Sequence, residues 1–285
     1  MPVTRAMRAN IPIDPFGRQG ARRRMCQGVR MPVITLTGAT GRIGTALRAR
    51  IPRDGETWRL VDLRPVTDPR PHEEAVTADL SDLEAVTGVV EGSDTVVHLA
   101  AVSTETSFDD ICRHNLVAAY NVFEAARVTG VRRVVFASTM HVTGYYPWDV
   151  TLTPDAPVRP DTLYGVSKAY GEALGRLYAD KHGLEVITVR IGNFVDRPDR
   201  PSDLPIWLSH DDAARLFRAC LDADIVDHVA LYGVSANTRR VWSDDGWEAI
   251  GYRPVDDSER YADDVPGELT RWQGMEFTER GFGLT

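Results

Sequence analysis

The sequence predicts an α/β protein built on a doubly wound parallel sheet. Short strands rich in β-branched residues alternate with helical segments from Met31 to about residue 191. The segment Val131–Ala137 is apolar enough for a central strand that is buried on both faces. A glycine-rich turn joins the first strand to the first helix. This alternation is typical of a parallel sheet with helices on both sides.

The expected elements follow from apolar periodicity and from helix-end signals. Strands are expected at Val33–Thr37, Thr57–Val61, Ala75–Ala78, Thr95–Leu99, Val131–Ala137 and Leu184–Arg190. Helices are expected at about Arg42–Ile51, at about Asp109–Thr129, and from the Tyr164 region to about Lys181. Another helix is expected to begin with Ser209 as its cap and Asp212 three residues on. From residue 192 onward, a loop rich in Pro, Asp and Arg is followed by short elements with tryptophans.

Composition and charge exclude several classes of protein. Of the 285 residues, 43% are hydrophobic and 26% charged, and no apolar run approaches the roughly 18 residues of a membrane span. The net charge is −8, although residues 1–30 carry +6, from seven arginines against Asp14 alone, which leaves −14 for the rest. Because an acidic body repels polyanions, nucleic acid is not expected as a partner.

The basic segment 1–30 is expected to be a dispensable, disordered extension. A transit-like or surface-binding tail is the alternative, although the segment lacks the apolar core of a secretion signal. Cys26, Cys112 and Cys220 are scattered without metal-ligand spacing, which predicts a reducing cytoplasm and no metal site. The sequence leaves open whether the protein is a homo-oligomer.

The glycine-rich turn has the spacing of a dinucleotide site. Gly38, Gly41 and Gly44 lie between the strand Val33–Thr37 and the helix that starts near Arg42. Glycines at this spacing permit a tight turn, a close approach of the backbone to a pyrophosphate, and close packing of helix on strand. The helix N-terminus offers free N–H groups to the phosphates. Three glycines alone are weak evidence, but their place between strand and helix is the required context.

Two carboxylates follow later strands and indicate which dinucleotide binds. Asp62 ends the second strand, where an acid accepts hydrogen bonds from ribose hydroxyls and repels a 2′-phosphate, so NAD is favoured over NADP. Arg64 lies two residues on and could soften this preference, or it could be a solvated loop charge. Asp79 is placed to meet the adenine amino group. Small residues at Ala100 and Ala101, after the fourth strand, would let the cofactor approach the backbone.

Tyr164 and Lys168 form the candidate catalytic pair. Four residues apart at the start of a helix, they share one helix face. We expect the ammonium to favour the ionised phenol and so to give Tyr164 a route to proton transfer. An ordinary surface pair is the alternative, although Lys168 is one of only two lysines against thirty-one arginines. Ser138 and Thr139, at the end of the fifth strand, could hold a substrate oxygen for this transfer.

These motifs together resemble the extended short-chain dehydrogenase/reductase (NAD-dependent epimerase/dehydratase) family over residues 31–285. Within that family the chain is most similar to uronate dehydrogenases. The stretches that carry this second resemblance are Val135-Phe136-Ala137-Ser138, His141, Gly144-Tyr145-Tyr146-Pro147, Leu163-Tyr164-Gly165-Val166-Ser167-Lys168, Val189-Arg190-Ile191-Gly192, Trp207 with Ser209-His210-Asp211-Asp212, and Gln273-Gly274.

The resemblance implies a Rossmann-like domain at residues 31–191 and a small substrate-binding subdomain at 192–285, interleaved with it. It implies Thr139, Tyr164 and Lys168 as the catalytic residues. The implied NAD-binding residues are Gly38, Gly41, Arg42, Ile43, Gly44, Asp62, Asp79, Leu80, Leu99, Ala100, Ala101, Asn115, Tyr164, Lys168 and Ile191. The implied substrate-binding residues are Ser103, Ser138, Thr139, His141, Asn193 and Arg200. Asn115 could instead be a satisfied helix residue, and His141 a neutral residue of the cleft wall.

The implied reaction is NAD-dependent oxidation of the anomeric carbon of a sugar acid or a related aldose to a lactone. Met140, Asn193 and Ser202 depart from the family's substrate-binding Asn, Ser and carboxylate-binding Arg. Arg200 lies two residues from the expected arginine position and could replace it, or it could be an exposed loop residue. A nucleotide-sugar epimerase or dehydratase, and a non-catalytic NAD-binding regulatory protein, are the alternatives.

Overall fold

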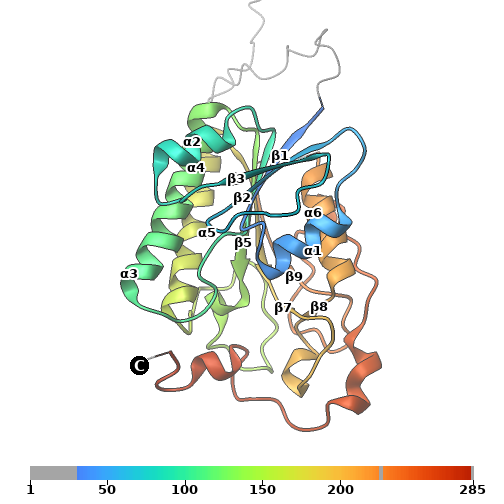
Figure 1. The fold of residues 1–285 in the computed structure, drawn as a ribbon. Helices are drawn as coiled ribbons and strands as arrows, with labels where there is room; N and C mark the ends of the chain where they lie inside the picture. Colours follow the sequence, from blue (N-terminus) through green and yellow to red (C-terminus); the bar gives the residue numbers. More distant parts are fainter. Residues whose placement is uncertain (1–30, 225–226, 284–285) are drawn as a thin grey trace, which may run out of the picture. The chain divides into compact units, whose positions relative to one another are not determined.

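A seven-stranded sheet forms the centre of the fold, in the order β3-β2-β1-β4-β5-β6-β9 (Figure 1). Every neighbouring pair in it is parallel. Its strands are β1 (Val33–Thr37), β2 (Thr57–Asp62), β3 (Glu73–Thr77), β4 (Thr95–His98), β5 (Arg133–Thr139), β6 (Glu185–Ile191) and β9 (His228–Gly233). This computed structural model describes residues 31–224 and 227–283, so the extension expected at 1–30 lies outside the described residues. The predicted doubly wound α/β fold is confirmed.

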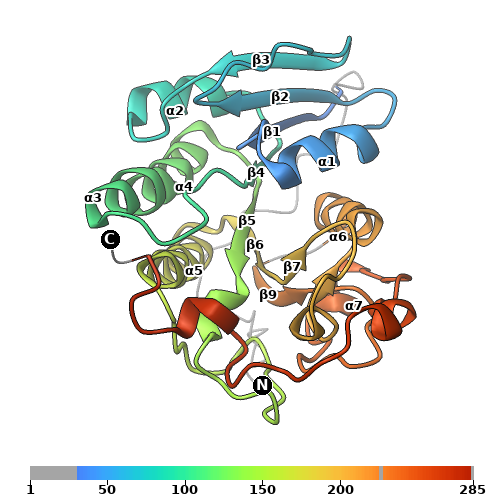
Figure 2. The ribbon, with the colours of Figure 1, turned by 60° about the horizontal axis from the view of Figure 1, so that its bottom comes forward.

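Helices cover both faces of the sheet (Figures 1 and 2). On one face α1 (Arg42–Arg50) packs against α6 (His210–Asp222). On the other face α4 (Ala118–Thr129) lies between α2 (Leu83–Val90) and α5 (Leu163–His182) and contacts both. Each face therefore buries its own apolar core.

The two cores consist of fully buried side chains from the sheet and the covering helices. The core under α1 and α6 includes Leu36, Leu47, Leu60, Leu216 and Phe217. The core under α2, α4 and α5 includes Val86, Val96, Val122, Phe123 and Val186. Burial of apolar surface on both faces explains why the central strands are apolar throughout and do not alternate with polar residues.

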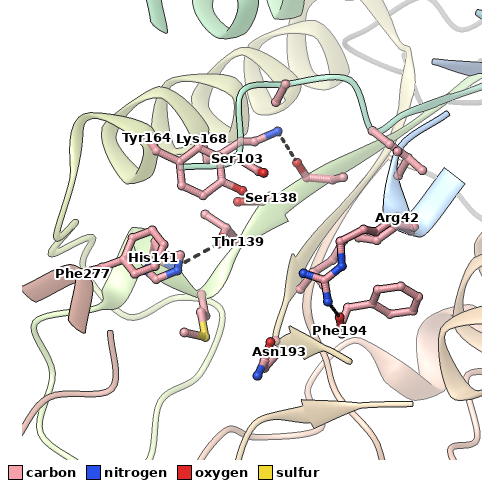
Figure 3. A pocket seen from close by; sticks show the side chains of 18 of the residues that line it. Arg42, Ser103, Ser138, Thr139, His141, Tyr164, Lys168, Asn193, Phe194 and Phe277 are labelled. Atoms are coloured by element: carbon pink, nitrogen blue, oxygen red, sulfur yellow. Dashed lines mark hydrogen bonds between the residues drawn. The ribbon is translucent and has the colours of Figure 1, made fainter. Parts of the chain in front are cut away.

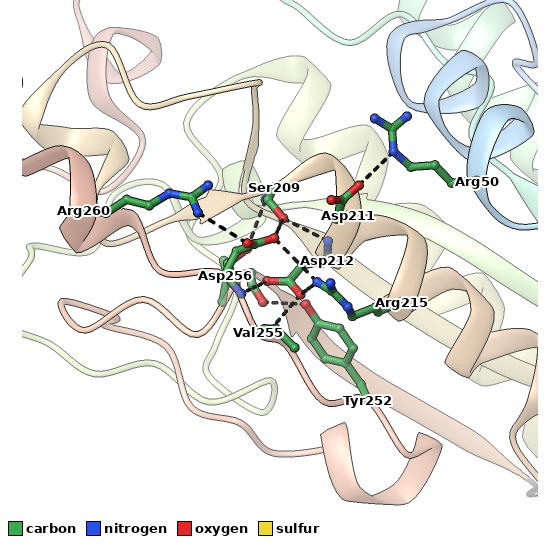
Figure 4. Close-up of polar contacts among 11 residues, drawn as sticks. Arg50, Ser209, Asp211, Asp212, Arg215, Tyr252, Val255, Asp256 and Arg260 are labelled. Carbon is green, nitrogen blue, oxygen red and sulfur yellow. Dashed lines mark hydrogen bonds and ion pairs between the residues drawn. The ribbon is translucent and has the colours of Figure 1, made fainter.

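The start of α6 matches the expected cap and also anchors a distant segment (Figure 4). The Ser209 hydroxyl accepts the N–H of Asp212 at 2.9 Å and donates to Asp256 at 2.6 Å. The fully buried Asp212 carboxylate accepts the backbone N–H groups of Val255 and Asp256, each at 2.9 Å, and pairs with Arg215. The Asp212 carboxylate therefore binds the backbone of residues 255–256. It does not bind the backbone N–H of the cap residue, as the acid of a capping box would.

Several elements differ from the sequence-based expectation. Strand β3 begins at Glu73 and not at Ala75, because Glu73 pairs with Trp58 of β2. The expected helix 109–129 begins as α3 (Phe108–Ile111) and is interrupted by a π-helical stretch, η1 (Cys112–Val117), before α4. Helix α2 and strand β9 were not predicted. Because β9 pairs with β6, the chain after residue 191 contributes a strand to the main sheet.

The chain after β6 also forms short elements beside the ends of the strands. These are β7 (Asn193–Phe194), η3 (Pro201–Asp203), β8 (Trp207–Leu208), α7 (Trp247–Ile250), η4 (Ser258–Asp264) and η5 (Met275–Thr278). The last of them returns to the loop after β5, where the N–H groups of Gln273 and Gly274 donate to the carbonyls of Tyr146 and Gly144, both at 2.9 Å. Figure 2 shows this segment crossing the open end of the fold.

Membrane insertion has no support in the helices of the structure: within the described ranges, none combines the length and apolar character of a membrane span.

The buried guanidinium of Arg133 joins β5 to the end of α6, and we expect its loss to destabilise the fold. Its side chain is fully buried and donates to Glu185 and to the carbonyls of Cys220, Leu221 and Ala223. Arg133→Met would remove the donor to the three carbonyls and should lower the free energy of unfolding by about 2–4 kcal/mol. Urea denaturation followed by circular dichroism measures this change.

The neighbouring residue provides a matched control. Arg132 also pairs with Glu185, but its side chain is half exposed. Arg132→Met should therefore cost less than about 1 kcal/mol. Equal losses for the two variants would contradict the assignment of Arg133 as the structural link.

Candidate active site

Two adjoining cavities lie at the carboxyl ends of the parallel strands, between the loops that follow β1 and β4. The larger, of about 430 Å³, extends from the glycine turn past β5 to the start of α5. The smaller, of about 300 Å³, lies between the ends of β1, β2 and β4. Gly38, Gly41 and Ala101 line both. Open α/β sheets bind ligands at this point, where the strand order reverses.

The glycine turn fits a pyrophosphate because it leaves no room for side chains. Gly38 has a φ of +72°, and a Cβ there would lie 2.7 Å from the backbone nitrogen of Ala100. A Cβ at Gly44 would lie 2.3 Å from the Gly38 carbonyl oxygen. Gly41 precedes α1, and no side chain caps the N–H groups of its first turn. The turn can therefore present bare backbone to phosphate oxygens.

Asp62 lines the smaller cavity, at the position expected for a ribose-binding acid. Its carboxylate accepts the backbone N–H groups of Thr40 at 3.0 Å and Arg64 at 3.1 Å. The Arg64 side chain also lines this cavity, with its Nε 3.9 Å from the Asp62 carboxylate. The carboxylate is thus fixed by backbone donors, while the guanidinium beside it is largely exposed.

Asp79 lines the same cavity with Leu80 and Ala100. It accepts hydrogen bonds from the backbone and the hydroxyl of Ser81 and pairs with Arg113 at 2.6 Å. These contacts, led by the Ser81 N–H, lower the pKa of Asp79 to about 2. A permanently ionised acceptor therefore faces the part of the cavity expected to hold the adenine.

Tyr164 and Lys168 are buried on the wall of the larger cavity (Figure 3). Thr162 caps α5 by accepting the N–H of Gly165 at 3.0 Å, which places Tyr164 in the first turn. Lys168 Nζ donates to the Ala137 carbonyl at 2.8 Å and lies 5.9 Å from the centre of the Tyr164 ring. The pair is therefore not an ordinary surface pair.

Burial, and not the neighbouring ammonium, dominates the ionisation of both groups. Burial raises the pKa of Tyr164 to about 12, although the neighbouring Thr139 hydroxyl opposes the shift. It lowers the pKa of Lys168 to about 7. The expectation that Lys168 alone favours the ionised phenol is therefore wrong for the cofactor-free protein, since removal from water disfavours the charged form of each group.

The hydroxyls at the end of β5 have different partners. The Ser138 hydroxyl donates to Glu172 at 2.6 Å, and Arg190 holds that carboxylate with two hydrogen bonds. Thr139 accepts the N–H of His141 at 3.3 Å and lies beside the Tyr164 phenol, where its hydroxyl opposes the rise of the Tyr164 pKa. Thr139 is therefore the hydroxyl that meets the phenol, as the sequence favoured, while Ser138 is tied to the wall behind it.

His141 has a partner that the sequence did not reveal. Its Nδ1 lies 2.7 Å from a carboxylate oxygen of the buried Asp161, and its ring stacks on Phe277 at 4.0 Å between centroids. A Cβ at Gly144 or Gly274 would fall within about 2 Å of the same oxygen. The two glycines thus make room for the carboxylate. Asp161 is 20 residues from His141 in the sequence, so no local signal pointed to this contact.

Most of the expected site residues line the two cavities. The larger contains Gly38, Gly41, Arg42, Ile43, Gly44, Leu99, Ala101, Ser103, Ser138, Thr139, His141, Tyr164, Lys168, Ile191, Asn193 and Arg200. The smaller adds Asp62, Asp79, Leu80 and Ala100. Three lining residues near the C-terminus, Met275, Glu276 and Phe277, were not expected from the sequence, although the preceding Gln273-Gly274 is part of the uronate dehydrogenase resemblance.

Asn115 lies outside the lining of both cavities. Its amide bonds the N–H and the carbonyl of Val102 at 2.8 and 3.0 Å and the Ser167 hydroxyl at 2.9 Å. These contacts hold the loop after β4 against α5. The position expected for direct cofactor contact is therefore one that supports the cavity wall. The π-helical stretch contains Asn115 and marks a local departure from regular helix.

The described ranges 31–224 and 227–283 contain no cluster of three His, Cys, Asp or Glu side chains that could hold a metal ion. The polar side chains of the larger cavity include hydroxyls, an imidazole and an amide, which can bind the hydroxyl groups of a ligand and transfer protons.

The fold and the site define a dinucleotide-dependent α/β enzyme class, and comparison with known proteins agrees. Residues 34–203 match the NAD dependent epimerase/dehydratase family. The chain belongs to this family, and NAD is its cofactor.

Within the family, the chain is similar to sugar dehydrogenases. Uronate dehydrogenase of Pseudomonas putida is 42% identical over 230 residues, 80% of this chain and 85% of that protein. L-arabinose 1-dehydrogenase (NAD(P)(+)) of Haloferax volcanii is 37% identical over 80% of this chain and 98% of its own. A crystal structure of a uronate dehydrogenase variant from Agrobacterium tumefaciens, complexed with NAD, matches with a TM-score of 0.84 at 39% identity, over 87% of this chain and 97% of that one.

Asp62 should set the preference for NAD over NADP. In Asp62→Ser the carboxylate that repels a 2′-phosphate is gone, while Arg64 stays beside the cavity. We expect the ratio of the NADPH to the NADH dissociation constant to fall about tenfold, measured by calorimetry. Arg64→Ala is the companion variant and should raise the ratio. A ratio that neither variant changes would contradict the assignment.

The pKa of Lys168 predicts how stability varies with pH. The native pKa of about 7 lies below the ordinary value of 10.5, so between these values only the unfolded chain carries the proton. The free energy of unfolding must then rise with pH in this window. We expect it to rise by about 2–4 kcal/mol more in the wild type than in Lys168→Met between about pH 7 and pH 10.

The second lysine supplies the control for this measurement. Lys181 is exposed at the end of α5. Lys181→Met should therefore follow the wild-type pH dependence in cofactor-free protein. If the wild type and Lys168→Met rise in parallel, Lys168 is not desolvated as described.

Proposed function

We propose that this protein oxidises the anomeric carbon of a sugar acid or a related aldose to a lactone, with NAD as the electron acceptor. The observation that carries the proposal is the buried Tyr164 hydroxyl, which lies with Thr139 on the wall of a cavity that continues to the glycine turn. Proton transfer and cofactor binding are thereby brought to one crevice. The likeness to uronate and arabinose dehydrogenases supports a sugar as the substrate.

In the proposed mechanism, Thr139 and Tyr164 hold the anomeric hydroxyl between them. In this step Tyr164 acts as the phenolate, the form that a bound cation favours, and accepts the hydroxyl proton as the C1–H bond breaks and the carbonyl of the lactone forms. When bound, NAD supplies the acceptor for the hydride and a positive charge near the phenol. The Lys168 Nζ donates to the Ala137 carbonyl and can also hold a ribose hydroxyl.

The remaining cavity residues have proposed binding roles. Ser103, His141, Asn193 and Arg200 face the sugar, and Ser138 supports the end of β5. Asp161 is proposed as a positioning residue, since its contact with His141 Nδ1 leaves the other ring nitrogen for a substrate hydroxyl. The dinucleotide would be bound by Gly38, Gly41, Arg42, Ile43, Gly44, Asp62, Asp79, Leu80, Leu99, Ala100, Ala101 and Ile191. Residues 192–285 are proposed to supply the substrate-binding part.

A cytoplasmic location is part of the same proposal. Cys112 and Cys220 are free thiols, as a reducing compartment would leave them. A homo-oligomer is compatible with the proposal but is not needed for it, because the cavities described above are lined by one chain.

Replacing Tyr164 tests the chemistry directly. With NAD and a panel of galacturonate, glucuronate and neutral aldoses, the wild type should form NADH and a lactone. Tyr164→Phe removes the proton acceptor and should lower kcat by a factor of about 10²–10⁴ on any active substrate. NADH binding, measured by calorimetry, should not change.

Tyr170 is the matched control. It lies on the same helix, is exposed, and does not line either cavity. Tyr170→Phe should keep wild-type kcat. Full activity of Tyr164→Phe, or NADH formation only with nucleotide sugars, would overturn the proposed function.

A further inference from the structure

An ion pair on the wall of the larger cavity joins two segments far apart in the chain. Arg200 Nη1 donates to Glu276 Oε2 at 2.8 Å, and both side chains line the cavity that holds Tyr164. They are 42% and 37% exposed, so the pair is open to a bound molecule. Arg200 is the residue proposed above to meet the carboxylate of a sugar acid. A carboxylate of the protein therefore already occupies it.

A second carboxylate binds the same guanidinium from behind. Arg200 Nε donates to the fully buried Asp203 at 3.3 Å, and the Asn193 amide donates to the same oxygen of Asp203 at 2.7 Å. Burial raises the pKa of Asp203. Even if Asp203 is protonated, Glu276 alone balances the charge of Arg200. This corner of the cavity thus carries no net positive charge.

The charge balance affects which group of a sugar can bind there. A carboxylate is read best by a guanidinium with a free, two-pronged face. Here a sugar carboxylate would have to displace Glu276 or lie beside it, and like charges at contact distance repel. A hydroxyl group is both a donor and an acceptor, so it can accept from Arg200 and donate to Glu276 at once.

The backbone on both sides of Glu276 is held in place. The N–H of Gly274 donates to the Gly144 carbonyl, and Phe277 stacks on His141. Between them, Met275 has a φ of 53°, which makes it the non-glycine residue with positive φ in the described ranges. This conformation is uncommon for a residue with a side chain and needs support from its surroundings. The segment is therefore built to aim Glu276 at the cavity.

We propose that Glu276 is a specificity-determining residue, which shifts the selectivity of the sugar site from carboxylates toward hydroxyls and extends its substrates to neutral aldoses. The inference rests on the proposed function, since it concerns the same cavity. Glu276 acts on the end of the sugar away from the anomeric carbon. It takes no part in proton transfer.

Matched pairs of sugars test the proposal. Glucuronate and glucose, and likewise galacturonate and galactose, differ only by a carboxylate in place of a hydroxymethyl group. In Glu276→Gln the ratio of kcat/KM for the acid to kcat/KM for the neutral partner should rise at least tenfold over the wild type, chiefly through KM for the acid. In the double variant Arg200→Ala, Glu276→Gln, this gain should disappear.

Glu279→Gln is the control, because it removes the same charge from an exposed residue three positions on, outside both cavities. Its ratio should stay within about twofold of the wild type. A ratio unchanged in Glu276→Gln for both sugar pairs overturns the inference.

A binding measurement separates this inference from the proposed function. Calorimetry of glucuronate and glucose on the NADH-loaded protein needs no turnover. If no sugar is oxidised, the proposed function fails, and the calorimetric ratio then decides the inference alone. A tenfold gain for glucuronate in Glu276→Gln supports it, and an unchanged ratio refutes it.

Discussion

The proposed chemistry of this protein depends on the burial of a phenol and an amine side by side. Tyr164 and Lys168 leave water because α5 packs onto β5 and places its first two turns over the end of that strand. Burial moves both pKa values toward the neutral forms, to about 12 and about 7. The contacts that bury these two side chains thus also set their protonation in the absence of a ligand. A cation bound nearby would shift both pKa values.

Close packing at the glycine turn brings the cofactor to this pair. Gly38 lies against the backbone of Ala100, so the loops after β1 and β4 meet where the strand order reverses. Asn115 fixes the second loop against α5 through Val102 and Ser167. One edge of the sheet therefore carries the cavity proposed for the dinucleotide, the hydroxyls of Thr139 and Tyr164, and the start of α5. Precise placement of this kind is what proton and hydride transfer require.

The last segment of the chain completes the sugar end of the cavity. Phe277 packs on His141, Gly274 makes room for Asp161, and Glu276 binds Arg200. The conserved chemistry of a fold and its choice of substrate can thus lie on different parts of one chain, as is common where sites are built on shared folds. Here the glycine turn and the Tyr164–Lys168 pair lie before residue 192, and the charge proposed to select the sugar lies near the C-terminus.

The sequence by itself determined the class of fold, six of the seven sheet strands and most of the residues that line the two cavities. These depend on local signals, namely glycines between strand and helix, acids after strands, and a Tyr and a Lys on one helix face. Tertiary structure alone decided strand β9, the Asp161 contact, the role of Asn115 and the pairing of Glu276 with Arg200. Each depends on residues that meet only when the chain folds. The ionisation of Tyr164 belongs to this second group, because local spacing can show a neighbouring charge but not the loss of water around it.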